Sequence, residues 1–194
     1  MIKKIGIIPT VIERRKTVNL IIDNNLIFFL KKCFPKSDLE ILFDIKKDNK
    51  LNLIISCGGN TITALNKNTA NQFRSKLDKY YFKQTLKKNI PFLGICHGAQ
   101  FIANYYKSKI IRKKNHTNKN HLINFDTKKK ITVNSYHDFS IIKLGKELKK
   151  IAYTNDFSIE AFRHNKKKIL GIMWHPERYK KIKKFDLEFI KKYL

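Results

Sequence analysis

A cysteine between two glycines is the pattern in this chain best suited to nucleophilic chemistry. Positions 94–98 read GICHG, which places Cys96 between Gly94 and Gly98 after an apolar run. A strand that meets such a turn and continues into a helix lifts a nucleophile clear of the sheet, and the helix N-terminus favours thiolate over thiol. A small buried cysteine required by packing explains an isolated pattern of this kind about equally well.

A second motif favours chemistry over packing. His175 and Glu177 flank Pro176 directly after the apolar run GIMW at positions 171–174. Because this run is typical of a strand, both polar side chains are expected at a strand end, where they can converge on Cys96. Pro176 fixes the backbone φ angle, and a carboxylate so placed can orient an imidazole. A surface turn has the same composition, but the two motifs together predict a catalytic triad of Cys96, His175 and Glu177.

The first half of the chain alternates predicted strands and helices, which must position these motifs. Apolar runs at 5–9, 39–45, 51–55 and 91–95 predict strands, and three- and four-residue apolar spacings predict helices over 20–34 and 73–88. A buried helix is expected over 101–106. This alternation predicts an α/β fold, a three-layer sandwich with a mostly parallel central sheet and a nucleophile elbow, in a single domain over 1–194. Such sheets bind ligands at the carboxyl ends of their strands.

The remaining segments predict shorter elements. Residues 13–17 are polar and are expected to form a loop, whereas residues 108–158 contain short apolar runs between Lys/Asn-rich turns, typical of hairpins and edge strands. The runs 159–162 and 169–174 predict a further hairpin. The chain is expected to close with a short amphipathic helix over 185–194.

The charge is strongly positive, with 42 Lys and Arg residues against 15 Asp and Glu residues and a formal net charge of +27. Three interpretations compete: nucleic-acid binding, attraction of anionic small molecules, and a compositional bias toward Lys, Asn and Ile. The lysines are scattered and no aromatic-interleaved RNA-binding motif stands out, which favours a solvated surface over nucleic-acid binding. A charge of this size would still raise the encounter rate with a phosphate-bearing substrate, and salt would suppress that effect.

The cysteine pattern and the hydropathy indicate the compartment. Cys33, Cys57 and Cys96 form no CxxC pair, so neither a disulfide framework nor a zinc ribbon is expected. The apolar run at the N-terminus is too short for a signal peptide, and no stretch is long and charge-free enough to span a bilayer. We therefore expect a protein of the reducing cytoplasm that does not enter a membrane.

Several chemically capable residues are expected to be structural. Cys33 is predicted to lie in the core and Cys57 to be structural. His116 and His121 have no Cys, Asp or Glu at metal-ligand spacing, so a solvated loop is expected there, with no metal and no cofactor. Arg74 could pair with a substrate phosphate or carboxylate, but a solvated helix arginine is the favoured interpretation.

Four segments together carry a resemblance to a known family. Residues 56–60, 91–100, 133–137 and 171–177 resemble the class I glutamine amidotransferase superfamily, and most closely its γ-glutamyl hydrolase branch, the γ-glutamyl-γ-aminobutyrate hydrolase-like proteins. The likeness spans nearly the whole chain in the expected order. It implies that Cys96 attacks a γ-glutamyl carbonyl, that His175 shuttles the proton to the leaving group, and that Glu177 orients His175, after which the thioester is hydrolysed.

The resemblance also implies further site residues. The backbone N–H groups of Gly59 and His97 would form an oxyanion hole, which typically contributes about 3 kcal/mol per donor to transition-state stabilisation. The residues implied in substrate binding are Gly58, Asn60, Gln100, Asn134, Ser135, Tyr136 and His137. The sequence departs from members acting on polyamine and γ-aminobutyrate conjugates, which often carry Arg-Asp followed by Glu where this chain has Leu77, Asp78 and then Tyr81.

The function expected first is a free-standing cysteine hydrolase that releases glutamate from a γ-glutamyl conjugate. The basic surface favours an anionic leaving group, such as a nucleotide phosphoramidate of the γ-glutamyl-CDP-amidate type used in capsule and other surface-polysaccharide biosynthesis. Alternatives are a glutaminase component that supplies ammonia to a partner synthetase, a γ-glutamyl-polyamine or γ-aminobutyrate hydrolase, and a non-catalytic nucleic-acid-binding protein on the same fold.

Overall fold

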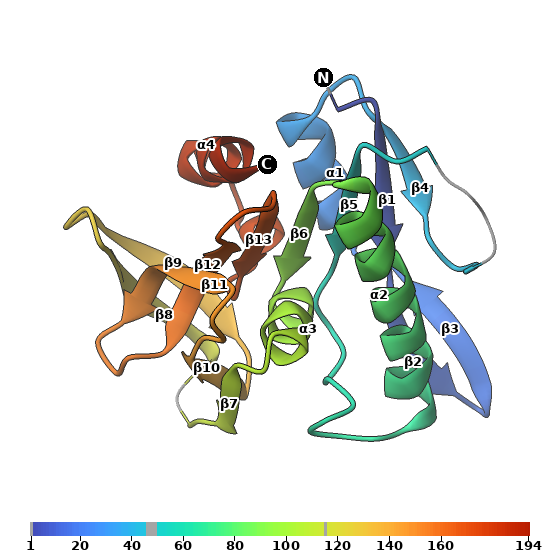
Figure 1. Cartoon of the computed structure of the whole chain (residues 1–194), viewed down its shortest axis with the longest axis horizontal. Coiled ribbons are helices and arrows are strands. Elements are labelled where there is room, and N and C mark those ends of the chain that lie inside the picture. The colour runs from blue at the N-terminus through green and yellow to red at the C-terminus, as the bar shows by residue number, and fades with distance from the viewer. Residues whose placement is uncertain (1, 46–49, 115) are drawn as a thin grey trace.

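A large mixed sheet forms the centre of the computed structural model, which describes residues 2–45, 50–114 and 116–194 (Figure 1). Within these residues the sheet has eleven strands. One half is parallel, in the spatial order β4 (Asp38–Ile41), β1 (Lys4–Ile8), β5 (Leu53–Ser56), β6 (Phe92–Ile95) and β13 (Ile169–Ile172). These five parallel strands agree with the mostly parallel central sheet that the sequence predicts.

The other half of the sheet is antiparallel and continues from β13. Its strands follow in the order β12 (Ile159–His164), β11 (Leu148–Thr154), β8 (Thr117–Phe125) and β9 (Lys130–Tyr136). A branch is formed by β10 (Phe139–Lys143), which pairs with both β12 and β7 (Lys109–Arg112). The hairpins predicted between 108 and 158, and the one formed by β12 and β13, are confirmed.

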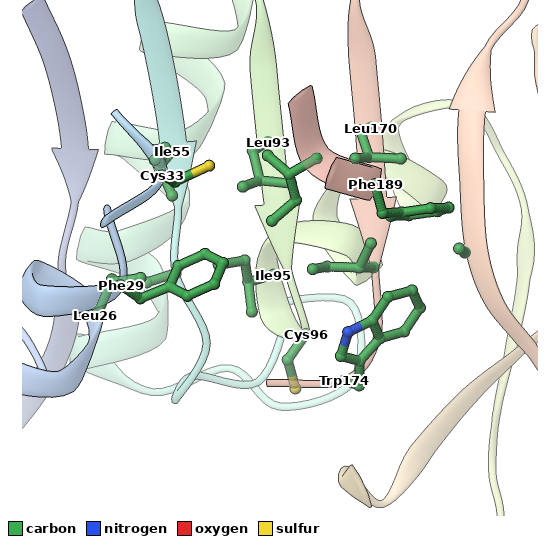
Figure 2. Packing of buried hydrophobic residues seen from close by; sticks show 14 of the residues in the cluster. Leu26, Phe29, Cys33, Ile55, Leu93, Ile95, Cys96, Leu170, Trp174 and Phe189 are labelled. Carbon is green, nitrogen blue, oxygen red and sulfur yellow. The ribbon is translucent and has the colours of Figure 1, made fainter. Parts of the chain in front are cut away.

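Helices cover both faces of the parallel half. On one face, α1 (Asn24–Cys33) and α4 (Lys184–Tyr193) pack their apolar side chains on β1, β5, β6 and β13, and Figure 2 shows Phe29, Ile95 and Trp174 in this layer. On the other face, α2 (Thr69–Lys88) and α3 (His97–Tyr105) pack Phe82 and Ile102 against the sheet. The predicted three-layer α/β class is therefore confirmed.

Two predicted boundaries are wrong near the N-terminus. The expected loop at 13–17 lies in a two-stranded hairpin of β2 (Thr10–Arg14) and β3 (Thr17–Ile21). The helix predicted from residue 20 begins only at Asn24, because the Asp23 side chain caps it by accepting a hydrogen bond from Asn25 N at 2.9 Å. Leu20 and Ile22 extend the apolar spacing but lie outside the helix.

The other differences lengthen predicted helices. The helix expected from residue 73 begins at Thr69, where the Asn68 side chain accepts a hydrogen bond from Asn71 N at 2.8 Å. The helix expected from residue 101 begins at His97, directly after the cysteine. Among the helices of the described ranges, none combines the length and the apolar character needed to cross a bilayer.

Candidate active site

Cys96 occupies a strained turn between β6 and α3. Its φ of 50° and ψ of −98° lie in a region that non-glycine residues rarely adopt, and strain of this kind is concentrated at functional sites. Its backbone N donates to Ile172 O at 2.8 Å, which fastens the turn to β13. In Figure 2 the thiol lies at the end of β6, beyond the packed core side chains. The elbow predicted at Cys96 is thus present in the structure.

The close approach of α3 to β5 explains one of the flanking glycines. A Cβ atom on Gly98 would lie 2.2 Å from Ser56 O, a distance that real Cβ atoms do not reach. Glycine at this position therefore allows the first turn of α3 to pass directly over the end of β5, with Cys96 raised at its start.

His175 meets Cys96 because β13 and β6 are neighbouring parallel strands. Ile172 pairs with Ile95, so the residues that follow each strand emerge side by side at the carboxyl edge of the sheet. The His175 side chain forms a hydrogen bond with the Cys96 thiol. Its other ring nitrogen, Nδ1, donates to Glu177 Oε1 at 2.6 Å. The structure therefore brings the three predicted catalytic residues into one chain of contacts.

The two reacting side chains adjust each other's ionisation. Burial alone would raise the pKa of the Cys96 thiol, but the charge and the hydrogen bond of His175 lower it below its ordinary value. Burial likewise disfavours the charged imidazole, but the thiolate and Glu177 raise the pKa of His175 to about 9. Both shifts favour the thiolate–imidazolium pair, and the thiolate is the form in which a cysteine is a nucleophile.

Asn134 holds the backbone of His175 in place. Its Oδ1 accepts from His175 N at 2.8 Å, and its Nδ2 donates to His175 O at 2.8 Å. Tyr179 Oη in turn accepts from Asn134 N at 3.1 Å. The side chain expected to contact substrate thus positions His175.

Gly58 forms the opposite wall of the site. A Cβ atom there would lie 2.6 Å from His175 Cε1 and 3.4 Å from Cys96 Cβ. No side chain can be accommodated between this loop and the two reacting residues. The backbone following Gly58 is therefore free to approach a substrate bound to Cys96, as the predicted oxyanion role of Gly59 requires.

A buried network of charged side chains binds the backbone directly before Gly58. Arg74 is 0% exposed, and its guanidinium contacts Asp78 Oδ2 at 3.0 Å and donates to Cys57 O at 2.7 Å and Pro9 O at 2.5 Å. The expectation that Arg74 is a solvated helix residue is wrong. Its i,i+4 spacing to Asp78, on the helix face that carries Leu77, is the one sequence signal that could have indicated this network.

The network continues to the first residue of α3. His97 Nε2 lies 2.8 Å from Asp78 Oδ2, and His97 Nδ1 lies 3.0 Å from Asn60 O. Burial and the neighbouring Arg74 lower the pKa of His97 below its ordinary value, although Asp78 and the Asn60 carbonyl act in the opposite direction. Burial would raise the pKa of Asp78, but Arg74 and His97 lower it, so the carboxylate remains charged. The side chains of Arg74, Asp78 and His97 thus join the predicted oxyanion loop to both helices.

The other side chains implied in substrate binding are mostly used within the protein. Asn60 pairs with both backbone groups of Val11 at 2.8 Å, Gln100 Nε2 donates to Phe139 O at 3.0 Å, and the fully buried Ser135 donates to His116 O. Tyr136 is different. The residue is 37% exposed, and its ring lies 5.6 Å from the His175 ring and 4.9 Å from the Arg178 guanidinium, so Tyr136 and Arg178 could contact a substrate together.

Three further predictions concern residues outside the triad. Cys33 and Cys57 are buried, as expected, and Cys57 Sγ donates to Ile8 O at 2.9 Å. The solvated loop expected around His116 and His121 is wrong: His116 is buried and His121 lies in strand β8. His137, implied in substrate binding, is buried beside them.

Known proteins share this sequence pattern and fold. Residues 32–192 match the family model for Glutamine amidotransferase class-I. A Gamma-glutamyl-CDP-amidate hydrolase of Campylobacter jejuni is 41% identical over 125 residues, which cover 64% of this chain and 62% of that protein. A glutamine amidotransferase-like protein of Lactococcus lactis is 27% identical over 139 residues, covering 61% and 59%. The alignments thus span less than two thirds of either relative.

Solved structures agree with the sequence comparison. A glutamine amidotransferase from Thermotoga maritima superposes with a TM-score of 0.66 at 18% identity, over 91% of this chain and 76% of that one. A Thermoplasma acidophilum protein assigned provisionally to GMP synthase gives a TM-score of 0.74 at 18% identity, over 100% and 92%. The fold is therefore shared, and the predicted resemblance is confirmed. By the match over residues 32–192, this chain belongs to the class-I glutamine amidotransferase family.

Proposed function

We propose that this chain hydrolyses the amide bond of a γ-glutamyl conjugate and releases glutamate. The observation that carries the proposal is the buried contact chain from the Cys96 thiol through His175 to Glu177 at the strained end of β6. The Cys96 thiolate attacks the γ-carbonyl carbon, and His175 donates its Nε2 proton to the departing nitrogen. Water then attacks the thioester, His175 takes up the water proton, and the thiolate leaves as glutamate is formed.

Each tetrahedral intermediate carries a negatively charged oxygen, and hydrogen-bond donors that are already in position stabilise it. The N–H of His97 is the first of helix α3 and has no partner within the helix, and the loop at Gly59 approaches because Gly58 carries no side chain. These two groups form the oxyanion hole in this proposal. The Arg74, Asp78 and His97 network supports both of them.

A basic cavity beside the triad supports a phosphate-bearing leaving group. It has a volume of about 330 Å³, and its lining includes Asn134, Tyr136, Arg178, Tyr179, Lys180 and Lys183. Asn134 and Tyr136 also contact His175, so the cavity begins where the leaving group would depart. Arginine and lysine bind phosphate, and exposed aromatic rings can stack on a base. The Campylobacter relative, whose name specifies a CDP-amidate, makes a nucleotide phosphoramidate the substrate of first choice.

The substrate class can be tested with a matched panel. Glutamate release would be followed by mass spectrometry with γ-glutamyl-CDP-amidate, a neutral γ-glutamyl alkylamide and free glutamine. We expect the phosphate-bearing conjugate to have the highest kcat/KM, with a preference that declines as salt rises. Equal or faster turnover of the neutral amide would refute the phosphate-bearing leaving group. Turnover of glutamine alone, enhanced by a partner synthetase, would instead identify a glutaminase component.

A further inference from the structure

Three histidines and one glutamate converge inside the antiparallel half of the sheet. They are His116, His121, His137 and Glu160, and one ligand atom from each lies within 4.8 Å of all the others. His116 precedes β8 and His121 lies within it, His137 follows β9, and Glu160 lies in β12. Their separation in sequence explains why no metal-ligand spacing is visible in the chain.

The geometry converges on one carboxylate oxygen. Glu160 Oε1 lies 3.8 Å from His116 Nδ1, 3.9 Å from His121 Nε2 and 3.4 Å from His137 Nε2. Ligand atoms bonded to zinc at about 2.0–2.1 Å in a tetrahedral site are about 3.3 Å apart. The three distances from Glu160 Oε1 are close to this value, and all the ligand atoms lie within 4.8 Å of one another, so rotations of the side chains would bring them to the spacing of a tetrahedral site.

The side-chain nitrogen and oxygen atoms that face one another in this cluster have no hydrogen-bond partner among the described residues. Both oxygens of Glu160, both ring nitrogens of His137, His116 Nδ1 and His121 Nε2 are buried without a hydrogen-bond partner in the described residues. Burying so many polar atoms unsatisfied would cost a protein several kcal/mol, because each lost hydrogen bond costs about 1–3 kcal/mol. A bound cation would take one ligand atom from each residue and so satisfy four of these six atoms at once.

A carboxylate behind His116 gives the cluster the outer contact typical of a metal ligand. His116 Nε2 lies 2.8 Å from Asp156 Oδ2, and Asp156 also pairs with Lys113 Nζ at 2.9 Å. When a histidine donates its outer N–H to a carboxylate, its tautomer is fixed and the lone pair of its inner nitrogen faces the metal. His116 Nδ1 is that inner nitrogen and faces Glu160.

We propose that His116, His121, His137 and Glu160 bind one divalent transition-metal ion of the zinc class. Three imidazoles with one carboxylate suit Zn²⁺, and the same set would bind Co²⁺ as a spectroscopic substitute. The side chain of His121 is 14% exposed, whereas the other three are nearly or fully buried, so the ion would enter past His121. The proposal does not depend on the substrate of Cys96.

The ion would hold the strand segment that carries Asn134. His137 follows the end of β9, three residues after Asn134, and Asn134 holds the backbone of His175. A metal that fixes β9 to β12 would therefore keep the wall of the active site in place. Its role in this proposal is structural, and it takes no part in the chemistry at Cys96.

Cobalt titration tests the site directly. The Cys96→Ala protein is used, so that the nearby thiol cannot act as a ligand, and Co²⁺ is added after treatment with a chelator. We expect the visible absorption of tetrahedral Co²⁺ to saturate at one ion per chain, to be displaced by Zn²⁺, and to raise the melting temperature. Absence of tetrahedral bands, or saturation without a thermal shift, would overturn the proposal.

Variants identify the ligands. Glu160→Gln keeps the side-chain volume, and His121→Gln changes the most exposed ligand; each should weaken Co²⁺ binding at least about 100-fold. His164→Gln is the matched control, because His164 lies at the end of β12 outside the cluster and should leave binding unchanged. If the ligand variants bind Co²⁺ as tightly as the parent protein does, the ion binds at another site. If Glu160→Gln does not fold, Co²⁺ binding by His121→Gln and the metal content of the parent protein test whether this cluster binds the ion.

Discussion

The side chain of Asn134 binds the backbone of His175 on both sides, accepting from its N–H and donating to its carbonyl at 2.8 Å each. Asn134 lies within the antiparallel strand β9, whereas His175 follows β13 of the parallel half. The imidazole is thus positioned by the two halves of the sheet together.

Removing this contact should impair catalysis without removing any reacting group. We expect Asn134→Ala to lower kcat by about 100-fold, because displacing a catalytic group by about 1 Å can have that effect. The alkylation of Cys96 should also shift to higher pH, since a displaced His175 stabilises the thiolate less. A merely structural effect would lower the melting temperature and leave the alkylation profile unchanged. Lys130→Ala, an exposed change on the same strand, serves as the control.

Cys96 should be the reactive thiol of the three. Cys96→Ala should abolish turnover by several orders of magnitude and leave the fold intact, because the members of a catalytic set act as a unit. Iodoacetamide followed by peptide mass spectrometry should modify Cys96 first, because burial raises the pKa of Cys33 to about 11 and also raises that of Cys57. Turnover by Cys96→Ala, or faster labelling of Cys33, would contradict the assignment.

The pH dependence of kcat/KM should have an alkaline limb near the pKa of His175. The folded protein raises this pKa to about 9, above the ordinary value of about 6.5, so the imidazolium that protonates the leaving group persists until the pH rises through about 9. Glu177→Gln should move the limb to lower pH, because the carboxylate stabilises the charged ring. If the alkaline limb of the wild-type protein lies near the ordinary histidine pKa of about 6.5, Cys96 and His175 do not form a thiolate–imidazolium pair.

Arg74 should contribute strongly to stability because its partner Asp78 is fully buried. We expect Arg74→Met to lower the free energy of unfolding by about 3–5 kcal/mol, the usual effect of leaving a buried charge unpaired. The double variant Arg74→Met/Asp78→Leu should regain part of this loss. Urea denaturation measures both, with Lys76→Met on the exposed face of α2 as the control. A loss for Arg74→Met no larger than that of the control would contradict the role of the network.

Asp186 should make stability depend on pH in the opposite sense to most acidic residues. Burial raises its pKa to about 6, although Trp174 Nε1 donates to it at 2.9 Å. The folded state therefore binds a proton more tightly than the unfolded state, and this contribution to stability declines as the pH rises from about 4 to about 6. Asp186→Asn should stabilise the protein by up to about 2 kcal/mol at pH 7 and by little at pH 4. Glu188→Gln, an exposed change on the same helix, should show no such difference.

The elements nearest the triad could be predicted because local signals agree there. An apolar strand, a glycine-flanked cysteine and a second strand ending in His-Pro-Glu each have a short-range pattern, and parallel pairing places such strand ends at one edge. The hairpin at 10–21 is not apparent in the sequence because the charged residues Glu13 to Lys16 interrupt its alternation of apolar and polar residues.

The supporting residues could not be predicted because their partners are distant in sequence. Arg74 reaches the backbone of Pro9 and Cys57, and His116 meets Glu160 only when β8 and β12 lie in the same sheet. Composition around each of them indicates a solvated surface, since lysine and asparagine are frequent there. Burial of these groups is decided by strand order, which single-sequence patterns do not specify.

The pairing of β6 with β13 has a consequence for the order of events during folding. Ile95 and Ile172 are joined by a long intervening segment, and contacts of such separation form slowly because loop closure must come first. Until β13 docks, Cys96 lacks the His175 imidazole that lowers the pKa of its thiol, so it should react as an ordinary thiol. The rate at which Cys96 becomes hyperreactive during refolding should therefore report when the two halves of the sheet come together.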